Sequence, residues 1–310
     1  MEKIYDLIIL GGGPGSMSAG VYAMQLKLDA LLIEKETFGG QVATTSNVTN
    51  YLGFPSISGS ELAENMHKHL SNTEIEIKHE EVVYTDLGQE IKVVKTHSGE
   101  YYARAVIIGI GTTIRKLSVE NENKYVGKGI SYNSLKDRDL FENKNVAVVG
   151  GGNSAIEDAL YLSEKAKKVY LIHRRNEFRG DPLLVENLYK QIDKNHNIEL
   201  VLECKPHSII GTEKVEKFVV THIPTNTTRT LDVDGIFVCI GRGADTEIID
   251  EKVARNESGY IITNEQMQTN IAGIYAIGDI RNTPLRQIIT ACSDGAIASV
   301  SAKNYLRNLK

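Results

Sequence analysis

Two stretches of the chain share one order of apolar and polar positions. Each has a short apolar run leading into a glycine-rich loop, then a segment with helical spacing, then a second apolar run. The expected strand, helix and strand lie at 5–10, 17–26 and 30–33 in the first stretch, and at 146–149, 154–166 and 169–172 in the second. The loops begin at Gly11 and Gly150, so the pattern repeats with an offset of 139 residues.

Short strands of alternating polarity follow each repeat and predict two small antiparallel meanders. They are expected at 75–78, 82–85, 91–96 and 101–103, and again at 198–203, 218–222 and 235–240. Two further apolar strands are expected at 105–110 and 273–279, the second ending in a Gly-Asp pair. Further helices are predicted to begin at Ser58, which forms a capping box with Glu61, and near Ile288.

This order of elements predicts an α/β fold. We expect two Rossmann-like, three-layer dinucleotide-binding domains, each with a small β-meander. The joints between the domains are expected near Leu117 and near Asp245, where buried strands finish in glycine-containing turns.

Composition excludes several classes of function. The 310 residues carry 35 Lys and Arg against 40 Asp and Glu, a formal net charge of −5, which disfavours a nucleic-acid partner. The apolar runs are too short to span a bilayer, and the N-terminus lacks the pattern of a signal peptide, so we expect a cytoplasmic protein without a membrane partner. The three cysteines, Cys204, Cys239 and Cys292, have no metal-ligand spacing, and no metal site is expected.

Both glycine loops have the chemistry of a pyrophosphate site. A helix N-terminus offers unpaired N–H groups and a partial positive charge, and glycine lets the backbone approach a phosphate closely. A single G-x-G-x-x-G loop is weak support, because tight strand-to-helix turns also need glycine. Two such loops with matching spacing are much stronger support.

The residues that end the second strand of each repeat differ. Glu34 can accept hydrogen bonds from a ribose diol and would repel a 2′-phosphate. The corresponding position in the second repeat is His173, followed by Arg174 and Arg175, with Arg179 one turn further on. These arginines supply positive charge for a 2′-phosphate, and the alternative is a solvated basic strand end. The pattern favours NADPH over NADH at the second loop.

These motifs together resemble those of a low-molecular-weight thioredoxin reductase-type flavoprotein over essentially the full chain. The matching positions are Gly11-Gly12-Gly13-Pro14, Glu34, Gly39-Gly40-Gln41, Asn50, Gly150-Gly151-Gly152-Asn153-Ser154-Ala155, His173-Arg174-Arg175, Phe178-Arg179, Gly278-Asp279 and Arg286-Gln287. The resemblance implies a discontinuous FAD-binding domain, 1–117 with 245–310, and an NADP(H)-binding domain, 118–244, inserted into it. It also implies a homodimer and a rotation of the NADP(H) domain that brings the nicotinamide to the flavin.

The resemblance implies a set of residues at each site. For FAD they are Gly11, Gly13, Pro14, Gly15, Ser16, Glu34, Gly40, Gln41, Asn50, Gly111, Gly278, Asp279, Arg286 and Gln287. For NADP(H) they are Gly150, Gly152, Asn153, Ser154, Ala155, His173, Arg174, Arg175, Arg179 and Gly241.

The main departure from this family lies at 132–138. The family has Cys-x-x-Cys-Asp-Gly there, whereas this chain has Asn133 and Lys136 at the cysteine positions and Arg138 at the glycine. Asn133 and Lys136 would face the flavin or its acceptor; alternatively, Asn133 or Ser134 caps a short helical turn and Lys136 is solvated. Cys292 is a weak substitute, because one thiol cannot close an internal disulfide.

The expected function is therefore an NADPH-dependent FAD oxidoreductase. NADPH would reduce FAD by hydride transfer, and the electrons would pass directly to an external acceptor, either a ferredoxin- or flavodoxin-type protein or a quinone-like small molecule. Thioredoxin-disulfide reductase activity is not expected. Two alternatives remain open: a non-catalytic NADP(H)/FAD-binding redox sensor, and a disulfide reductase whose dithiol comes from a separate protein.

Overall fold

The computed structural model describes residues 3–309 and divides the chain into two compact units. The first comprises Met1–Thr113 and Gly243–Lys310, and the second comprises Ile114–Arg242. The joints predicted from the sequence, near Leu117 and Asp245, lie a few residues C-terminal to these boundaries. Two short strands, β7 (Thr113–Ile114) and β16 (Arg242–Gly243), pair where the chain passes from one unit to the other.

The first unit is built on a sheet with the strand order β3-β2-β1-β6-β5-β4, and β17 also pairs with β6. The strands are β1 (Ile4–Leu10), β2 (Ala30–Glu34), β3 (Glu76–His79), β4 (Val82–Asp86), β5 (Lys92–Thr96), β6 (Glu100–Ile108) and β17 (Ile274–Ala276). Pairing among β3, β2, β1, β6 and β17 is parallel, whereas β4, β5 and β6 form an antiparallel meander. The expected strands at 82–85, 91–96 and 101–103 are confirmed as a meander, but the strand expected at 75–78 is β3, which pairs in parallel with β2 at the far edge of the sheet.

One prediction about these strands is wrong. The sequence predicts separate strands at 101–103 and 105–110, but both belong to the single strand β6. Arg104 interrupts the apolar run only as a single exposed position between buried Ala103 and Ala105 of a continuous strand. The first half of β6 pairs with β5 and the second half with β17.

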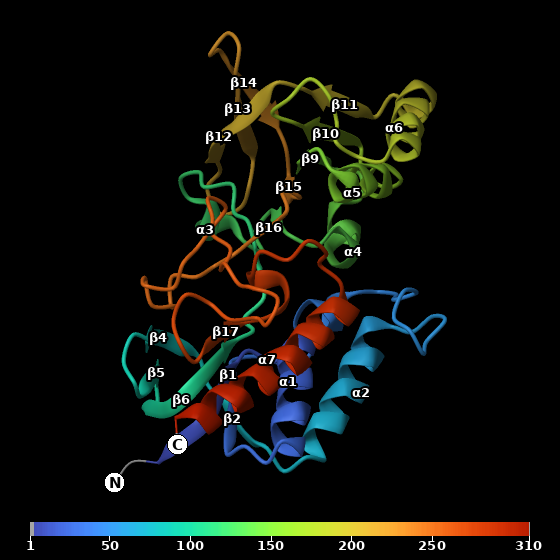
Figure 1. The fold of residues 1–310 in the computed structure, drawn as a ribbon. Coiled ribbons are helices and arrows are strands. Elements are labelled where there is room, and N and C mark those ends of the chain that lie inside the picture. Colours follow the sequence, from blue (N-terminus) through green and yellow to red (C-terminus); the bar gives the residue numbers. More distant parts are fainter. Residues whose placement is uncertain (1–2, 310) are drawn as a thin grey trace. The chain divides into compact units, whose positions relative to one another are not determined.

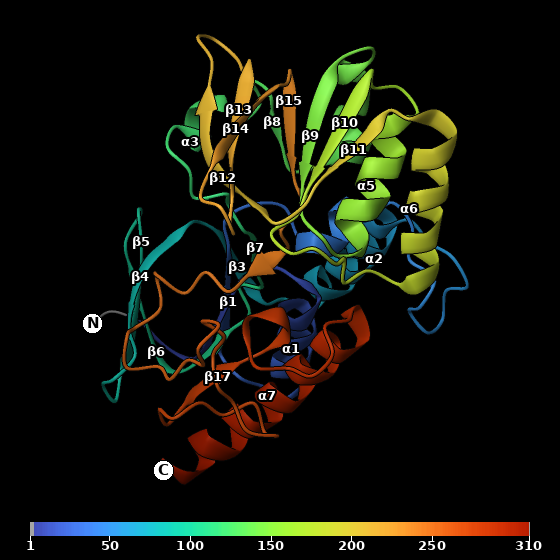
Figure 2. The same cartoon turned by 90° about the horizontal axis from the view of Figure 1, so that it is seen from above.

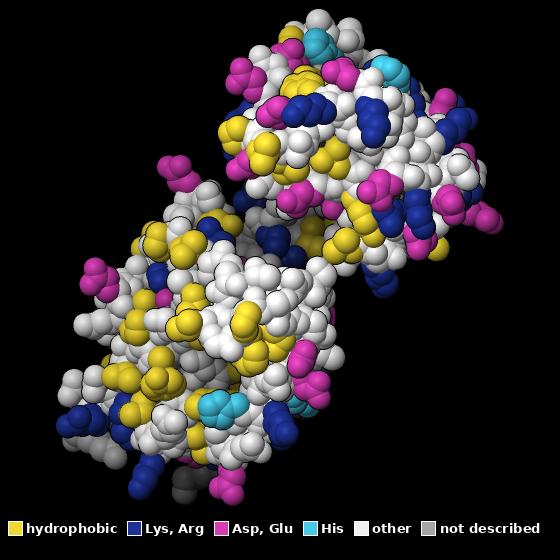
Figure 3. All heavy atoms as spheres, turned by 90° about the vertical axis from the view of Figure 1, so that its right-hand side faces the viewer, with side chains coloured by type: hydrophobic (Ala, Val, Ile, Leu, Met, Phe, Trp, Pro, Cys, Tyr) yellow, Lys and Arg dark blue, Asp and Glu magenta, His cyan; other side chains and the backbone are white. Residues whose placement is uncertain are grey.

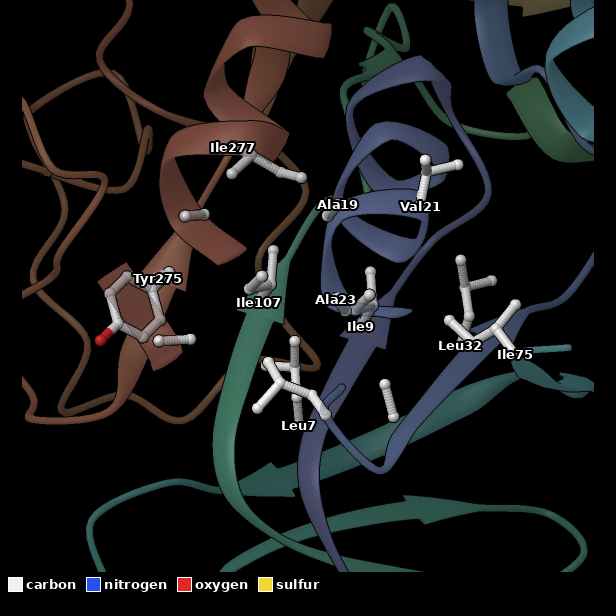
Figure 4. Close-up of a cluster of buried hydrophobic side chains, with 14 of the residues drawn as sticks. Leu7, Ile9, Ala19, Val21, Ala23, Leu32, Ile75, Ile107, Tyr275 and Ile277 are labelled. Atoms are coloured by element: carbon white, nitrogen blue, oxygen red, sulfur yellow. The ribbon is translucent and has the colours of Figure 1, made fainter. Parts of the chain in front are cut away.

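Alternation along β1 explains how the first unit packs. Leu7 and Ile9 belong to the apolar cluster that includes Ala19 and Ala23 of helix α1, as Figure 4 shows. Ile8, on the other face of the strand, belongs to a second cluster together with residues of the meander. A strand buried on both faces reads as a continuous apolar run, which is why the sequence predicted it so clearly.

Three long helices belong to this unit: α1 (Pro14–Gln25), α2 (Gly59–Ser71) and α7 (Ile288–Asn308). Two short 3-10 turns, η1 (Gly40–Thr44) and η3 (Gly278–Ile280), complete it. The Ser58 hydroxyl accepts the Glu61 N–H at the start of α2, which is one half of the expected capping box. Figure 1 shows α7 beside α1; a Cβ at Gly295 of α7 would overlap the Gly15 carbonyl oxygen, so glycine permits this close approach.

The second unit has a five-stranded sheet, all parallel, in the order β11-β10-β9-β15-β8. Its strands are β8 (Ile130–Ser131), β9 (Asn145–Val149), β10 (Lys168–Ile172), β11 (Ile198–Val201) and β15 (Gly235–Val238). A separate antiparallel meander consists of β12 (Cys204–Ile210), β13 (Lys217–His222) and β14 (Thr228–Asp232). Its helices are α3 (Glu122–Tyr125), α4 (Ser134–Asp137), η2 (Arg138–Phe141), α5 (Asn153–Ser163) and α6 (Pro182–Asn195).

The same alternation organises the second core. Val146 and Val148 of β9 pack with the apolar face of α5, whereas Ala147 and Val149 pack with the meander. Figure 2 shows α5 and α6 on one side of this sheet and β12–β14 on the other. The three-layer arrangement with a meander is therefore present in both units. The strands predicted for the second meander were partly wrong, because those at 198–203 and 235–240 are β11 and β15 of the parallel sheet and only the one at 218–222 lies in the meander.

Helix α6 was not predicted, although its start carries a clear signal. Asp181 accepts the Leu183 N–H at 2.9 Å, and Pro182 occupies the first helical position, where its missing N–H costs nothing. Leu188 is the one residue of the helix that is fully buried, and Leu184, Val185 and Ile192 pack partly buried against the same core cluster. Leu184, Leu188 and Ile192 recur at helical spacing, so the sequence carried a periodic signal that was overlooked.

Two surface features bear on possible partners: the distribution of charged side chains and the character of the helices. Acidic and basic side chains are interspersed on the face shown in Figure 3. Within residues 3–309, no helix combines the length and the apolar character needed to cross a bilayer.

Candidate functional site

In the first unit, the predicted FAD residues gather at the carboxyl ends of parallel strands. Gly11 follows β1, Glu34 ends β2, Gly111 comes shortly after β6 and Gly278 comes shortly after β17. All four strands belong to one parallel stretch of sheet, so these residues share one edge. Ligands of open α/β sheets bind at this edge.

The N-terminus of α1 is free to receive an anion. Its cap residue is Gly13, no side chain caps the helix, and its first turn carries no acidic residue. A Cβ at Gly13 would meet no atom within 4 Å, so the space above the loop is open. By contrast, α2 and α6 are capped by Ser58 and Asp181. The exposed N–H groups of α1 therefore suit a pyrophosphate.

Ser16 lies beneath the loop and not at its open surface. It is buried, and its hydroxyl donates to the Leu10 and Gly109 carbonyls at 3.4 and 3.3 Å. A Cβ at Gly109 would overlap the Ser16 hydroxyl oxygen. Ser16 thus serves helix–strand packing, the role that the third glycine has in such loops.

Glu34 contacts the first loop directly. Its carboxylate accepts the Gly12 N–H through Oε2 and the Glu36 N–H, at 2.7 Å, through Oε1. The side chain is therefore fixed against the loop by main-chain donors. A carboxylate held there can still accept from a ribose hydroxyl with its remaining lone pairs.

Gln41 and Asp279, predicted from distant parts of the sequence, lie together. The Gln41 amide donates to Asp279 Oδ2 at 3.4 Å and to Thr112 Oγ1 at 3.1 Å. Thr112 was not among the predicted site residues, although it directly follows the predicted Gly111. Its position after a buried strand and a glycine was the available signal.

A second pair joins Asn50 to Gln287. The Asn50 amide donates to Gln287 Oε1 at 3.0 Å. Gln287 also forms a capping box at the start of α7: its side chain accepts the Thr290 N–H, and the Thr290 side chain accepts the Gln287 N–H. The neighbouring Arg286 guanidinium lies 4.3 Å from the Tyr260 ring centroid, a cation–π contact that the sequence did not predict.

In the second unit, α5 repeats the arrangement of α1. Its cap residue is Gly152, no side chain caps it, and its first turn carries no acid. Asn153 Oδ1 accepts the Asp181 N–H at 2.7 Å, which ties this loop to the start of α6. Ser154 is exposed, and Ala155 is buried against Gly150. This helix N-terminus is also available to a pyrophosphate.

The three predicted arginines lie on the surface after β10. Arg174, Arg175 and Arg179 are exposed, and within the described part of the chain no hydrogen bond or ion pair engages their guanidinium groups. The Arg179 N–H donates to the Gly151 carbonyl at 2.8 Å, which places this segment against the loop. Gly241, with φ of +86°, follows β15 in open space.

His173 differs from the arginines that follow it. Only 5% of it is exposed, and its ring stacks on Phe178 with centroids 5.6 Å apart. Burial lowers the pKa of the imidazole, and the charges of Arg179, Arg175 and Arg174 lower it further, although a main-chain hydrogen bond to Glu177 acts in the opposite direction. The ring is therefore neutral at pH 7 and lies under the loop.

The segment at 131–138 is fixed by hydrogen bonds of its own. Asn133 Oδ1 accepts the Lys136 N–H at 3.1 Å and caps α4, while Lys136 is exposed. The Ser134 hydroxyl donates to Asp158 at 2.5 Å. This is the capping arrangement that the sequence offered as the alternative to a catalytic role for Asn133 and Lys136.

Glu122, which was not predicted from the sequence, contacts this segment through a hydrogen bond. Its buried carboxylate accepts the Leu117 and Ser118 N–H groups, each at 2.9 Å, and the Tyr132 hydroxyl at 2.8 Å. Burial raises the pKa of Tyr132, and the Glu122 carboxylate raises it further. Tyr132, directly before the capping residue Asn133, is thus held as a hydrogen-bond donor.

None of the three thiols has the environment of a reactive cysteine. Burial is the largest influence on each, and it raises the pKa of Cys204, Cys239 and Cys292. For Cys239, the Asp158 carboxylate raises the pKa further and accepts from Sγ at 2.8 Å. All three are free thiols, and each is protonated at neutral pH.

We expect slow thiol labelling of the native protein. The thiolate is the reactive form, and because these pKa values are raised, it becomes populated only above the ordinary pKa of a cysteine, about 8.5. N-ethylmaleimide at neutral pH should therefore modify native protein far more slowly than urea-unfolded protein, and the native rate should rise with pH. Mass spectrometry of timed samples measures this. Rapid labelling of one native cysteine at neutral pH would contradict the assignment.

Comparisons with known proteins cover almost the whole chain. A family model described as pyridine nucleotide-disulphide oxidoreductase matches residues 5–295. The thioredoxin reductase of Bacillus subtilis is 38% identical over 310 residues, covering 100% of this chain and 97% of the relative. The "34.2 kDa protein in rubredoxin operon" of Clostridium pasteurianum is 36% identical over 306 residues, 98% of both chains. The crystal structure of Lactococcus lactis thioredoxin reductase in the FR conformation has a TM-score of 0.83 and 32% identity, covering 98% of this chain and 99% of that one.

Proposed function

Because the chain belongs to the pyridine nucleotide-disulphide oxidoreductase family and is thioredoxin reductase-like, we propose that it is an NADPH-dependent FAD oxidoreductase without a dithiol of its own. Electrons from NADPH would pass through FAD directly to an external acceptor. The observation that carries the proposal is the segment at 131–138, which by its resemblance corresponds to the family's redox dithiol, holds no cysteine and forms a capped helical turn.

The first unit fits FAD. The family implies FAD and a pyridine nucleotide. The uncapped N-terminus of α1 would hold the pyrophosphate, and Glu34 would accept from the ribose of the adenosine. Asp279 and Gln41 would bind the ribityl or pyrophosphate part, and Gln287 would lie near the flavin ring. When bound, FAD supplies the two-electron chemistry that accepts a hydride and passes electrons onward.

The second unit fits NADPH. The N-terminus of α5 is uncapped, and the three exposed arginines that follow β10 have no acidic partner among the described residues. Guanidinium groups bind phosphate through charge-assisted, often bidentate hydrogen bonds. The same groups would gain little from a 2′-hydroxyl, so NADPH is favoured over NADH.

Thiol chemistry is not available for the second half of a thioredoxin reductase reaction. That reaction passes electrons from flavin to an internal disulfide and then to the partner by thiol–disulfide exchange. Here Asn133 and Lys136 replace the two cysteines, and the remaining thiols are protonated and partly or fully buried. The acceptor must therefore receive electrons from FAD itself.

A small redox protein is the favoured class of acceptor. The Clostridium pasteurianum relative is named for its place in a rubredoxin operon, and that name supports a small redox protein as the acceptor. Ferredoxin- and flavodoxin-type proteins belong to the same class, and a quinone-like small molecule is the alternative. None of these acceptors needs a dithiol on this chain.

A panel of acceptors tests the proposal. The FAD-loaded protein is reduced anaerobically with NADPH and mixed with rubredoxin, ferredoxin, flavodoxin, a quinone or thioredoxin, and the return of the flavin absorbance is followed. Rapid return with one of the first four and none with thioredoxin is expected. Rapid NADPH-driven reduction of thioredoxin would contradict the proposal, and reduction that no acceptor reverses faster than oxygen would favour a redox sensor instead.

We further propose that the chain forms a homodimer through the first unit. Ile297 and Val300 of α7 and Tyr22 of α1 are 37%, 43% and 41% exposed and line one shallow groove. Exposed apolar side chains grouped on adjoining helices are typical of protein–protein interfaces. Because the groove belongs to one unit, a second copy can bury it by two-fold symmetry.

Val300→Glu is expected to give a monomer. A carboxylate buried in this interface beside Ile297 and Tyr22 would have no cationic partner among the residues that line the groove, which costs about 3–5 kcal/mol. Analytical ultracentrifugation measures the change in mass. Asn65→Glu, which adds the same charge on the exposed face of α2, is the matched control and should leave the mass unchanged. An unchanged mass for Val300→Glu would exclude this interface.

A further inference from the structure

We propose that His173 is a positioning residue, whose ring sets the shape of the glycine loop 150–152 from beneath and does not bind the nucleotide. The inference rests on the proposed assignment of NADPH to the second unit. It differs from the expectation drawn from the sequence, which grouped His173 with the nucleotide-binding arginines.

The contact between the ring and the loop is direct. A Cβ added at Gly151 would overlap the His173 ring, so only glycine fits at the middle position of this loop. On its other side, the Gly151 carbonyl accepts the Arg179 N–H at 2.8 Å. The ring itself is fixed by its stack on Phe178, with an angle of 16° between the ring planes. Gly151 is thus enclosed between His173 and the main chain of Arg179.

The internal repeat contains the same pair with different chemistry. Residues 12 and 34 of the first unit correspond, at the offset of 139, to residues 151 and 173. A Cβ at Gly12 would lie 2.7 Å from Glu34 Cγ, and the Glu34 carboxylate accepts the Gly12 N–H. In both units, the residue that follows or ends the second strand supports the middle glycine of the loop.

The change from carboxylate to imidazole suits the ligand proposed for each unit. A carboxylate at 173 would place a negative charge close to the 2′-phosphate that the arginines are proposed to bind. The imidazole fills the space without that charge, and burial keeps the ring neutral. Its Nε2 atom is buried and has no hydrogen-bond partner within the described residues, so an apolar ring of similar shape would lose no hydrogen bond made by that atom.

A double-mutant cycle in the FAD-loaded protein tests the contact. Gly151→Ala should weaken NADPH binding by about tenfold or more, because overpacking displaces the loop, and His173→Ala should weaken it by a similar factor, because the support is lost. Combined with His173→Ala, the Gly151→Ala change should have a much smaller effect, since the methyl group then has room. His173→Phe, which keeps a flat ring, should bind NADPH within about threefold of wild type.

The matched control is Gly152→Ala in the same loop. A Cβ at Gly152 would meet no atom within 4 Å, so its effect and that of His173→Ala should multiply, without rescue. NADH provides a second readout: the loop would hold the pyrophosphate that both nucleotides share, so His173→Ala should weaken NADH and NADPH binding by the same factor. A phosphate ligand would instead affect NADPH alone.

The outcomes separate this inference from the proposed function. Multiplicative effects for Gly151→Ala and His173→Ala, or a loss confined to NADPH, would overturn the positioning role while leaving NADPH binding intact. If wild-type protein binds neither nucleotide, the proposed function and the positioning role in nucleotide binding both fail. In that case, the thermal unfolding midpoints of wild type, Gly151→Ala, His173→Ala and the double variant still show whether the two changes affect stability independently.

Discussion

Asp294→Ala is expected to destabilise the first unit by about 3–5 kcal/mol and to lower its FAD content. The Asp294 carboxylate accepts from Arg281 Nε at 2.7 Å and Nη2 at 3.0 Å, and the two side chains are only 7% and 12% exposed. Removing one partner of a buried ion pair leaves the other charge without compensation, which is the most costly way to break it. The same carboxylate accepts the Gly278 N–H at 3.0 Å, so the turn that presents Asp279 would lose its anchor as well.

Chemical denaturation and the ratio of flavin to protein absorbance measure both effects. The matched control is Lys95→Ala, which removes an exposed ion pair with Glu100 in the same unit. Exposed pairs contribute little, so that variant should lose less than about 1 kcal/mol and keep its FAD. An Asp294→Ala protein as stable as the control, with full FAD content, would show that the pair does not hold the turn.

The double variant Arg174→Ala/Arg175→Ala is expected to raise KM for NADPH by about 10- to 100-fold. A hydrogen bond to a charged group contributes about 1.5–3 kcal/mol, and a factor of ten corresponds to about 1.4 kcal/mol. The turnover number with saturating NADPH should change little, because the lost contacts are to a part of the nucleotide that does not react. Steady-state assays with a small-molecule acceptor measure both constants.

NADH is the internal control for this prediction, because it lacks the 2′-phosphate. Its KM should be nearly unchanged in the double variant, so the preference for NADPH should fall by the same factor. Arg229→Ala, at an exposed arginine of the same unit that pairs with Glu199, should change neither KM. An equal loss for NADPH and NADH would mean that the arginines support the structure and do not select the phosphate.

The sequence predicted those parts of the fold that follow from strand burial and loop chemistry. The strands β1 and β9 are buried on both faces and preceded glycine loops, so a continuous apolar run identified them. Helix α6 was overlooked although its signals were present, namely Asp181-Pro182 at its start and Leu184, Leu188 and Ile192 at helical spacing. The sequence wrongly predicted a break at Arg104, because a charged residue between two apolar runs has the same pattern whether it lies in a turn or at an exposed position of a long strand.

The sequence also predicted part of each candidate site, namely the residues that lie directly after strands. Residues directly after strands, such as Glu34 and Gly278, are positioned by topology, which a sequence pattern reveals. The pairing of Gln41 with Thr112 depends on which turns meet in space, and the burial of His173 depends on Phe178 and Gly151 packing around it. Those contacts are tertiary, so no local pattern contained them.

An anaerobic titration with NADPH tests the central claim most directly. A flavoprotein with its own redox disulfide takes up two equivalents of NADPH per FAD, one for the flavin and one for the disulfide. This protein should lose its visible flavin absorbance completely with a single equivalent and show no newly accessible thiols afterwards. Uptake of a second equivalent, accompanied by the appearance of two reactive thiols, would contradict the account, and so would a flavin that NADPH does not bleach.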